Sequence, residues 1–249
     1  MKPFAPLTML TILALMGAVV PVAAQTTPPP EPKIWTVTFG AGLAQASGNT
    51  DTFSFNASYD LTYDPQARNI VKSDALFLRS DTNGDLSADR FGFNFRDQYR
   101  ITKRAYVFGQ NQYLHDSFKD IDYLEALTGG IGYRLIDRPQ TTLDADTGLG
   151  VVWEKNPGFD VKTSGAWTAN EKLIHRLTAI VALTESVQAL WKTKDFDDAL
   201  YTIGVGIAVS TSTRTQLKFE VLDTYKNKPP SATVKKNDVA TLISFVFKT

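Results

Sequence analysis

Residues 52–63 read TFSFNASYDLTY and alternate between apolar and polar side chains. The odd positions carry Phe53, Phe55, Ala57, Tyr59, Leu61 and Tyr63. Because successive side chains of a strand point to opposite faces, this stretch predicts a β-strand with one apolar and one polar face. It is also longer than the strands of most soluble proteins, which average about 5–6 residues.

The same alternation recurs along the chain, for example in residues 141–154 and 199–210, and no helical period lasts. Each such segment is long enough to cross a bilayer at a tilt, which takes roughly 9–11 residues. The sequence therefore predicts an all-β fold, an antiparallel transmembrane β-barrel of about 12 strands. The predicted strands are 34–46, 52–63, 68–80, 89–101, 105–115, 123–135, 141–154, 160–173, 178–192, 199–210, 214–226 and 238–248.

The links between these segments alternate in length. Links such as 64–67, 102–104 and 174–176 are tight, whereas 81–87 and 226–238 are mostly longer and rich in charge. Short periplasmic turns on one rim and longer extracellular loops on the other are typical of outer-membrane barrels. An even number of strands places both chain ends on the periplasmic rim.

Aromatic residues fall near the ends of the predicted strands. Those near the periplasmic end are Trp35, Tyr63, Tyr99, Tyr133, Phe245 and Phe247. Those near the outer end are Phe53, Tyr113, Trp153, Trp191, Tyr201 and Tyr225. Two aromatic girdles around an apolar band are typical of the two water–lipid interfaces. The core of a soluble β-sandwich, the alternative, would not need its aromatic residues at the strand ends.

Residues 1–24 have the features of a secretory signal peptide. Lys2 supplies the positive charge, residues 7–20 form the apolar run, and Val22-Ala23-Ala24 supply small residues before a cleavage site. A transmembrane helix is the alternative, but the run is shorter than the roughly 20 residues of a span. Residues 25–33 contain four prolines and predict an extended tether. The barrel is expected over residues 34–249.

Composition excludes several classes of function. The chain has 249 residues, with 26 Lys and Arg against 26 Asp and Glu, no cysteine and two histidines. A net charge of zero excludes a strongly basic nucleic-acid binder. The absence of cysteine excludes thiolate metal sites, iron–sulfur clusters and cysteine nucleophiles. No cofactor and no metal ion are expected.

Charged residues on the polar face of the predicted strands are candidates for lining the lumen. They are Arg90, Arg96, Arg100, Asp144, Asp146, Lys218 and Glu220. Four acidic residues fall instead on the nominally apolar face: Asp97, Glu125, Glu185 and Asp223. Either a β-bulge shifts the local register at these positions, or they lie near a rim, where charge costs little.

The final strand ends in alternating Phe245 and Phe247, followed by Lys248-Thr249. A terminal aromatic of this kind resembles the signal that the barrel-assembly machinery reads, and the two residues after it are a small departure. Expected partners are therefore this machinery, through the C-terminal strand, together with outer-membrane lipid and lipopolysaccharide.

Several motifs together resemble one family. They are Gly40-Ala41-Gly42, Ser47-Gly48-Asn49-Thr50-Asp51, Gly129-Gly130-Ile131-Gly132-Tyr133 and Lys235-Lys236-Asn237-Asp238. With the signal peptide and the paired long strands, they resemble the domain of unknown function 481 family, described as salt-induced outer-membrane proteins. The resemblance covers about 34–248, and Ser47–Asp51 is its most specific piece. It implies a barrel in the cell outer membrane and carries over no catalytic residue.

A hydrolase site built on a serine and a histidine would have to use one of the two histidines. His115 is expected at the outer end of its strand beside Asp116 and Ser117, and His175 in a tight turn at the opposite rim. His115 and Asp116 point to opposite faces, so they are poorly placed to pair. The main interpretation of His115 is a solvated rim residue. A serine hydroxyl within reach of His115 is the feature that a hydrolase would need.

A cation site at the outer rim is a further possibility from the sequence. Residues 81–85 begin like a calcium loop, but the glycine and the twelfth residue do not match, so a turn at Asn83-Gly84 is the preferred interpretation. An acidic cluster of a protease type could be drawn from Asp81, Asp85, Asp116, Asp120 and Asp122, which more simply make a hydrophilic loop surface.

The predicted function is a non-enzymatic outer-membrane barrel, either structural or a small passive channel, linked to salt or osmotic stress by the family resemblance. A barrel hydrolase acting on lipid is the alternative. A soluble secreted β-protein is the third, and it would require the mature chain to stay soluble without detergent.

Overall fold

The computed structural model describes residues 33–46 and 52–249, and the predicted signal peptide, most of the tether and the Ser47–Asp51 motif lie outside them. The described chain forms twelve β-strands and one short 3-10 helix. The strands are β1 (Trp35–Ala46), β2 (Thr52–Tyr63), β3 (Asn69–Thr82), β4 (Asp85–Arg100), β5 (Ala105–Asp116), β6 (Ile121–Asp137), β7 (Thr141–Lys155), β8 (Lys162–Arg176), β9 (Val181–Lys192), β10 (Asp195–Ser210), β11 (Thr215–Lys226) and β12 (Asn237–Lys248). The helix η1 (Ser117–Lys119) lies between β5 and β6.

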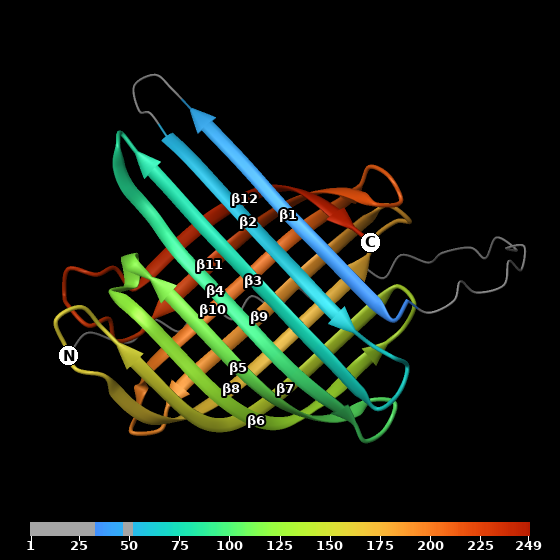
Figure 1. The fold of residues 1–249 in the computed structure, drawn as a ribbon, viewed down its shortest axis with the longest axis horizontal. Coiled ribbons are helices and arrows are strands. Elements are labelled where there is room, and N and C mark those ends of the chain that lie inside the picture. The colour runs from blue at the N-terminus through green and yellow to red at the C-terminus, as the bar shows by residue number, and fades with distance from the viewer. Residues whose placement is uncertain (1–32, 47–51) are drawn as a thin grey trace, which may run out of the picture. The chain divides into compact units, whose positions relative to one another are not determined.

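The strands form one closed barrel in which each strand pairs antiparallel with its neighbours in sequence, and β1 pairs with β12 (Figure 1). The predicted fold class is confirmed. We call the rim where β1 begins and β12 ends the terminal rim, and the opposite rim the loop rim. Among the residues described, no helix is long and apolar enough to cross a membrane.

Strand boundaries follow the predicted segments closely, and β2 matches its prediction at both ends. The long link predicted at 81–87 is wrong. Asn83 and Gly84 form a two-residue turn, in which both take positive φ angles of 54° and 84°, so β3 and β4 continue toward it. The turn predicted at 174–176 is also wrong, because β8 runs on to Arg176 and places His175 within the strand.

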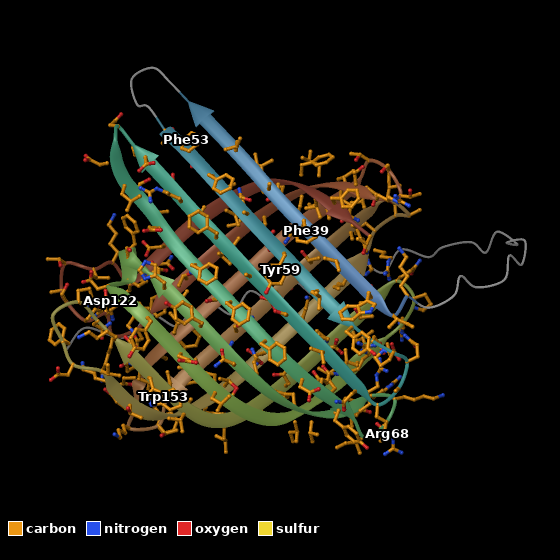
Figure 2. The ribbon with its side chains drawn as sticks, in the orientation of Figure 1. Phe39, Phe53, Tyr59, Arg68, Asp122 and Trp153 are labelled. Carbon is orange, nitrogen blue, oxygen red and sulfur yellow. The ribbon has the colours of Figure 1, made fainter. Side chains whose placement is uncertain are left out.

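The two faces of the wall differ sharply in exposure. On the outer face, Leu43 is 71% exposed and Leu149 66%, whereas Leu242 and Val152 on the inner face are 3% and 1% exposed. The aromatic residues predicted for the two girdles lie on the outer face, and Trp35 contacts Tyr63 with ring centroids 4.4 Å apart, whereas Tyr106 and Phe108 point inward and are buried. Figure 2 shows apolar side chains such as Phe39 and Phe53 along the outer surface. An apolar outer band of this kind is what lipid requires.

The four acidic residues on the apolar face lie in regular ladders. Asp97, Glu125, Glu185 and Asp223 each have partner residues on both neighbouring strands, and no register shift falls at these positions. The bulge interpretation is therefore wrong for all four. Two of them have amide partners on the same face: Asn69 donates to Asp97 at 3.3 Å and Asn111 to Glu125 at 2.9 Å.

The seam between β1 and β12 is the shortest in the barrel. Its register contains four residue pairs, from Thr38–Lys248 to Ala41–Phe245, whereas every other seam contains eleven or more. Where the ladder stops, Ser244 donates a hydrogen bond to Asn56 of β2 at 2.7 Å. Side chains therefore supply contacts across the seam beyond the backbone pairing.

Candidate functional site

Each predicted lumen residue has a charged partner in the structure. Arg96 contacts Asp146 at 2.7 Å, although β5 and β6 lie between their strands, so this ion pair passes through the barrel interior. Lys218 contacts Glu220 on its own strand at 2.8 Å. These two contacts join predicted residues to each other.

Two further predicted residues, Asp144 and Arg100, pair with groups that the sequence did not single out as partners. Asp144 binds Arg134 at 2.8 Å. Arg100 binds Asp64 in the turn after β2, at the terminal rim. Each of these pairs stays close to the wall.

Arg90 spans the barrel. Its guanidinium donates to Thr224 of β11 and contacts Asp116 at 3.5 Å. In the ring, four strands separate β4 from β11 in one direction and six in the other, so Arg90 reaches across the interior. Nearby, Lys119 of η1 is fully buried, contacts Asp238 of β12 at 2.7 Å and donates to two backbone carbonyls in the link before β12. The link after β5 is thereby tied to the β11–β12 side.

Eight apolar residues fill part of the interior toward the loop rim, and we call them the apolar layer. They are Leu114, Ile121, Leu124, Ala126, Val152, Ala166, Leu190 and Leu200, all 9% exposed or less. They come from strands β5 to β10, and burying them stabilises this half of the barrel through the hydrophobic effect.

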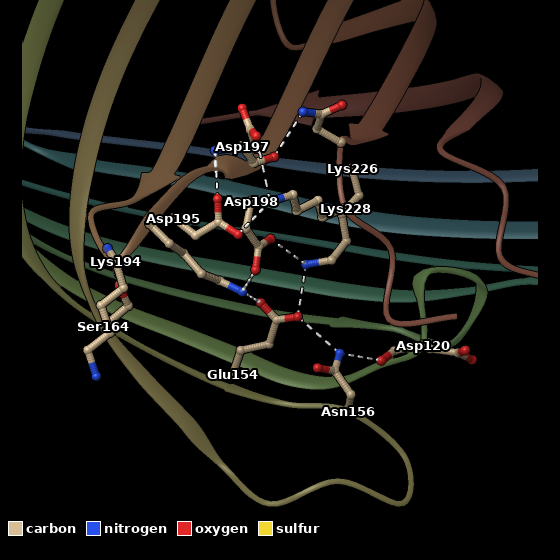
Figure 3. A network of polar contacts seen from close by, with 12 residues as sticks. Asp120, Glu154, Asn156, Ser164, Lys194, Asp195, Asp197, Asp198, Lys226 and Lys228 are labelled. Atoms are coloured by element: carbon tan, nitrogen blue, oxygen red, sulfur yellow. Dashed lines mark hydrogen bonds and ion pairs between the residues drawn. The ribbon is translucent and has the colours of Figure 1, made fainter. Parts of the chain in front are cut away.

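Four charged residues lie between the apolar layer and the loop rim. We call Glu154, Lys192, Asp198 and Lys226 the charged layer. Figure 3 labels Glu154, Asp198 and Lys226. Glu154 binds Lys192 at 2.6 Å and Lys226 at 2.8 Å, and Lys192 binds Asp198 at 2.6 Å. The side chains of Glu154 and Lys226 are each 2% exposed. Buried charges are tolerated only when paired in this way.

The charged layer continues into the loops. Asn156 donates to Glu154 at 3.0 Å and to the carbonyl of Asp120 at 2.7 Å. Lys228, in the link between β11 and β12, contacts Asp195 at 2.6 Å, and this hydrogen bond raises the pKa of the Lys228 ammonium. Sequence reasoning missed the charged layer. The sequence pattern that could have revealed it is the alternation. Glu154, Lys192 and Lys226 fall on the lumen face near the ends of alternate strands.

The interior on the terminal side of the apolar layer carries both polar side chains and the buried side chains of Ile70, Tyr106, Phe108 and Val246. A cavity of about 90 Å³ lies against the apolar layer and is lined in part by Asn94, Gln112, Asn170 and Gln188. Asp60 and Lys172 on the inner face stay exposed, and a cavity of about 670 Å³ lies at the terminal rim. The interior is thus partly polar on the terminal side of the apolar layer and closed by apolar and charged side chains on the other.

The histidines lie in different surroundings. His175 Nδ1 lies 2.8 Å from the hydroxyl of Thr141 on the neighbouring strand. His115 Nε2 lies 3.2 Å from Ser117 Oγ, and its Nδ1 lies 2.8 Å from the carbonyl oxygen of Asp122. Asp116 points inward to Arg90 and does not pair with His115, as alternation predicts. The serine contact that a hydrolase would need is therefore present.

Residues 81–85 form a hairpin turn, which confirms the prediction of a turn at Asn83-Gly84. Within residues 33–46 and 52–249, no group of three or more His, Asp or Glu side chains is arranged to hold a metal ion.

A closed antiparallel barrel with an apolar outer face and an ion-paired interior defines the architectural class of transmembrane β-barrels. The family model described as "Protein of unknown function, DUF481" matches residues 39–248, and the chain belongs to this family. The "Uncharacterized protein YdiY" of Escherichia coli (strain K12) is 22% identical over 205 residues, which cover 82% of this chain and 79% of that protein.

Two solved structures are among those to which the chain is similar. The COG4313 outer membrane channel from Pseudomonas putida F1 is 12% identical and has a TM-score of 0.49, with 90% of this chain and 100% of that chain covered. The NanC porin is 6% identical and has a TM-score of 0.47, with 86% of this chain and 97% of that chain covered.

Proposed function

We propose that the protein is a passive outer-membrane channel for small solutes that rests closed at its outer end. In this proposal the terminal rim faces the periplasm and the loop rim faces the cell exterior. The solute path begins in the polar interior at the terminal rim and ends at the apolar and charged layers.

The observation that carries the proposal is the charged layer. Glu154 joins Lys192 of β9 and Lys226 of β11 inside the barrel, directly outside the apolar layer. A barrel that never opens could be closed by apolar side chains alone, because a buried ion pair is often no more stabilising than well-packed apolar residues. Ion pairs, by contrast, can be replaced by water and mobile ions when the end opens. A closure that adds buried ion pairs to the apolar layer therefore favours a channel over a permanently closed barrel.

The predicted lumen residues would set the selectivity of this channel. Arg96 and Asp146 lie across the interior, and Lys218 and Glu220 lie beside each other on β11. Both signs of charge line the path, so we propose weak ion selectivity and passage of small polar solutes. The amide side chains around the cavity beneath the apolar layer would supply hydrogen bonds to such solutes.

Planar-bilayer conductance of the folded protein tests the proposal. Glu154→Gln removes the carboxylate charge that Lys192 and Lys226 share, so we expect longer and more frequent conducting events than in the wild type. Asp197→Asn is the control, since the Asp197 side chain is 79% exposed and lies outside the charged layer, and its opening frequency should match the wild type. If wild type and Glu154→Gln both insert and never conduct, the barrel is structural and the channel proposal fails.

The cellular parts of the prediction remain proposals. The role in salt or osmotic stress rests on the family resemblance, and growth of a deletion strain at raised salt, with and without the restored gene, tests it. Recognition by the barrel-assembly machinery rests on Phe245 and Phe247, and reduced membrane insertion of Phe247→Ala would support it. Contact with lipopolysaccharide rests on the placement of the loop rim at the cell exterior.

A further inference from the structure

His115 and Ser117 form a hydrogen-bonded pair on the outer face of the barrel near the loop rim. Ser117 Oγ lies 3.2 Å from Nε2 of His115, and Nδ1 of His115 lies 2.8 Å from the backbone carbonyl oxygen of Asp122. Both contacts involve residues of the β5–η1–β6 connection. Neither residue contributes to the apolar or charged layers inside the barrel.

These two contacts fix the tautomer of the ring. A carbonyl oxygen can only accept, so the Nδ1 atom of His115 must carry the proton and donate it to Asp122. In the neutral ring Nε2 is then the acceptor, and the Ser117 hydroxyl donates to it. A serine hydroxyl donating to a histidine whose other nitrogen is held by an acceptor is the arrangement of a nucleophile and its general base.

Two buried anchors hold Ser117 in place. On one side Asp116, at the N-terminus of η1, accepts hydrogen bonds from the backbone amides of Phe118 and Lys119 at 3.1 and 3.2 Å. On the other side the Lys119 side chain is fully buried against Asp238. Asp120 takes a φ of 50°, which turns the chain back toward β6. Ser117 itself is exposed, so it is both positioned and accessible.

The neighbouring surface is apolar and faces outward. Phe91 is the direct partner of His115 across the β4–β5 seam, and its ring lies 6.1 Å from that of Tyr113. Phe91 and Phe95 are exposed on this face of β4. An acyl chain lying along the barrel wall would contact these rings while its ester group, near the loop rim, would be level with Ser117 and His115.

We propose that Ser117 and His115 form an esterase site for acyl esters of membrane lipid. Ser117 Oγ attacks the ester carbonyl carbon while its proton passes to His115 Nε2. The tetrahedral intermediate then expels the alcohol, which takes that proton, and leaves an acyl ester on Ser117. His115 next removes a proton from water, whose oxygen attacks the acyl carbonyl, and the fatty acid leaves as Ser117 regains its proton. This proposal does not rest on the channel proposal.

Labelling with a rhodamine-tagged fluorophosphonate tests the nucleophile in the full chain, folded in detergent micelles. We expect labelling of the wild type, its loss in Ser117→Ala and a decrease of about 100-fold or more in rate in His115→Gln, as for removal of a general base. Ser87→Ala is the matched control, because Ser87 is exposed near the same rim and bonds to Thr82 rather than to a histidine. Its labelling should equal that of the wild type.

Release of fatty acid from phosphatidylethanolamine vesicles tests the substrate class. We expect release by the wild type and by Ser87→Ala, and none by Ser117→Ala. A folded wild type that takes up no label, or a Ser117→Ala variant that labels like the wild type, overturns the proposal. Labelling without fatty-acid release overturns the assignment to lipid esters.

Discussion

Glu154 and Glu220 are both glutamates with a lysine partner at 2.8 Å, yet they lie in opposite halves of the barrel interior and in different surroundings. The Glu154–Lys226 pair is 2% exposed on both sides, whereas the side chains of Lys218 and Glu220 are 32% and 22% exposed. Removing one partner of a buried pair leaves a buried charge without compensation. When one partner of a partly exposed pair is removed, water solvates the charge that is left. The same pairing chemistry is therefore buried at Glu154 and partly exposed at Glu220.

Substitution of Glu154 is expected to have the largest effect on stability. Glu154→Ala leaves Lys192 and Lys226 buried with Asp198 as their only carboxylate in the charged layer. Loss of one partner of a buried ion pair costs about 3–5 kcal/mol. Urea unfolding of the barrel in detergent, followed by the mobility shift between folded and unfolded forms, measures the change.

Glu220→Ala, the matched substitution in the terminal half, is expected to cost about 0.2–1 kcal/mol, as for an exposed pair. Equal losses for the two glutamates would show that burial does not distinguish the two halves.

Substitution of Arg96 is expected to have an intermediate effect. Arg96→Gln breaks the 2.7 Å contact with Asp146 and the stacking of the guanidinium over Phe108 at 3.7 Å. Asp146 keeps donors in Asn170 and Tyr106, so we expect a loss of about 1.5–3 kcal/mol, as for one hydrogen bond to a charged group. Since a positive charge leaves the path, the reversal potential in a KCl gradient should shift toward cation selectivity. An unchanged potential in a conducting variant would place Arg96 outside the path.

Lys228 is expected to have the smallest effect. Its half-exposed contact with Asp195 raises the pKa of Lys228 above the ordinary value of 10.5, so any stabilisation is present below that value and is lost as pH rises through the raised pKa. Lys228→Met should therefore lower the melting temperature slightly at pH 7 and in low salt. The difference should shrink as pH rises through that raised pKa, and salt should also reduce it. A large difference that persists in 1 M salt would mean that the contact belongs to the buried network.

Alternation identified the strands because lipid and lumen impose opposite demands on neighbouring residues, and the segment Thr52–Tyr63 shows this at both boundaries. The charged layer was not predicted. Alternation places Glu154, Lys192 and Lys226 on the inner face of their strands. Whether their side chains meet depends on the strand registers of all the seams between them, and the sequence of one segment does not contain that information. The contact between Arg90 and Thr224 likewise depends on the registers around the barrel, so it could not be predicted from one segment. His115 and Ser117 share a face by parity, but their contact depends on the turn of η1 and on the position of Asp122.

The short seam between β1 and β12 also bears on the order of folding. Every other seam joins strands that are consecutive in sequence, whereas this one brings together Val37 and Thr249, which are 212 positions apart. The entropic cost of closing a loop rises with its length, and only four residue pairs offset that cost here. We therefore expect the wall to close at β1 and β12 last during folding. Amide hydrogen exchange should be fastest along the same two strands.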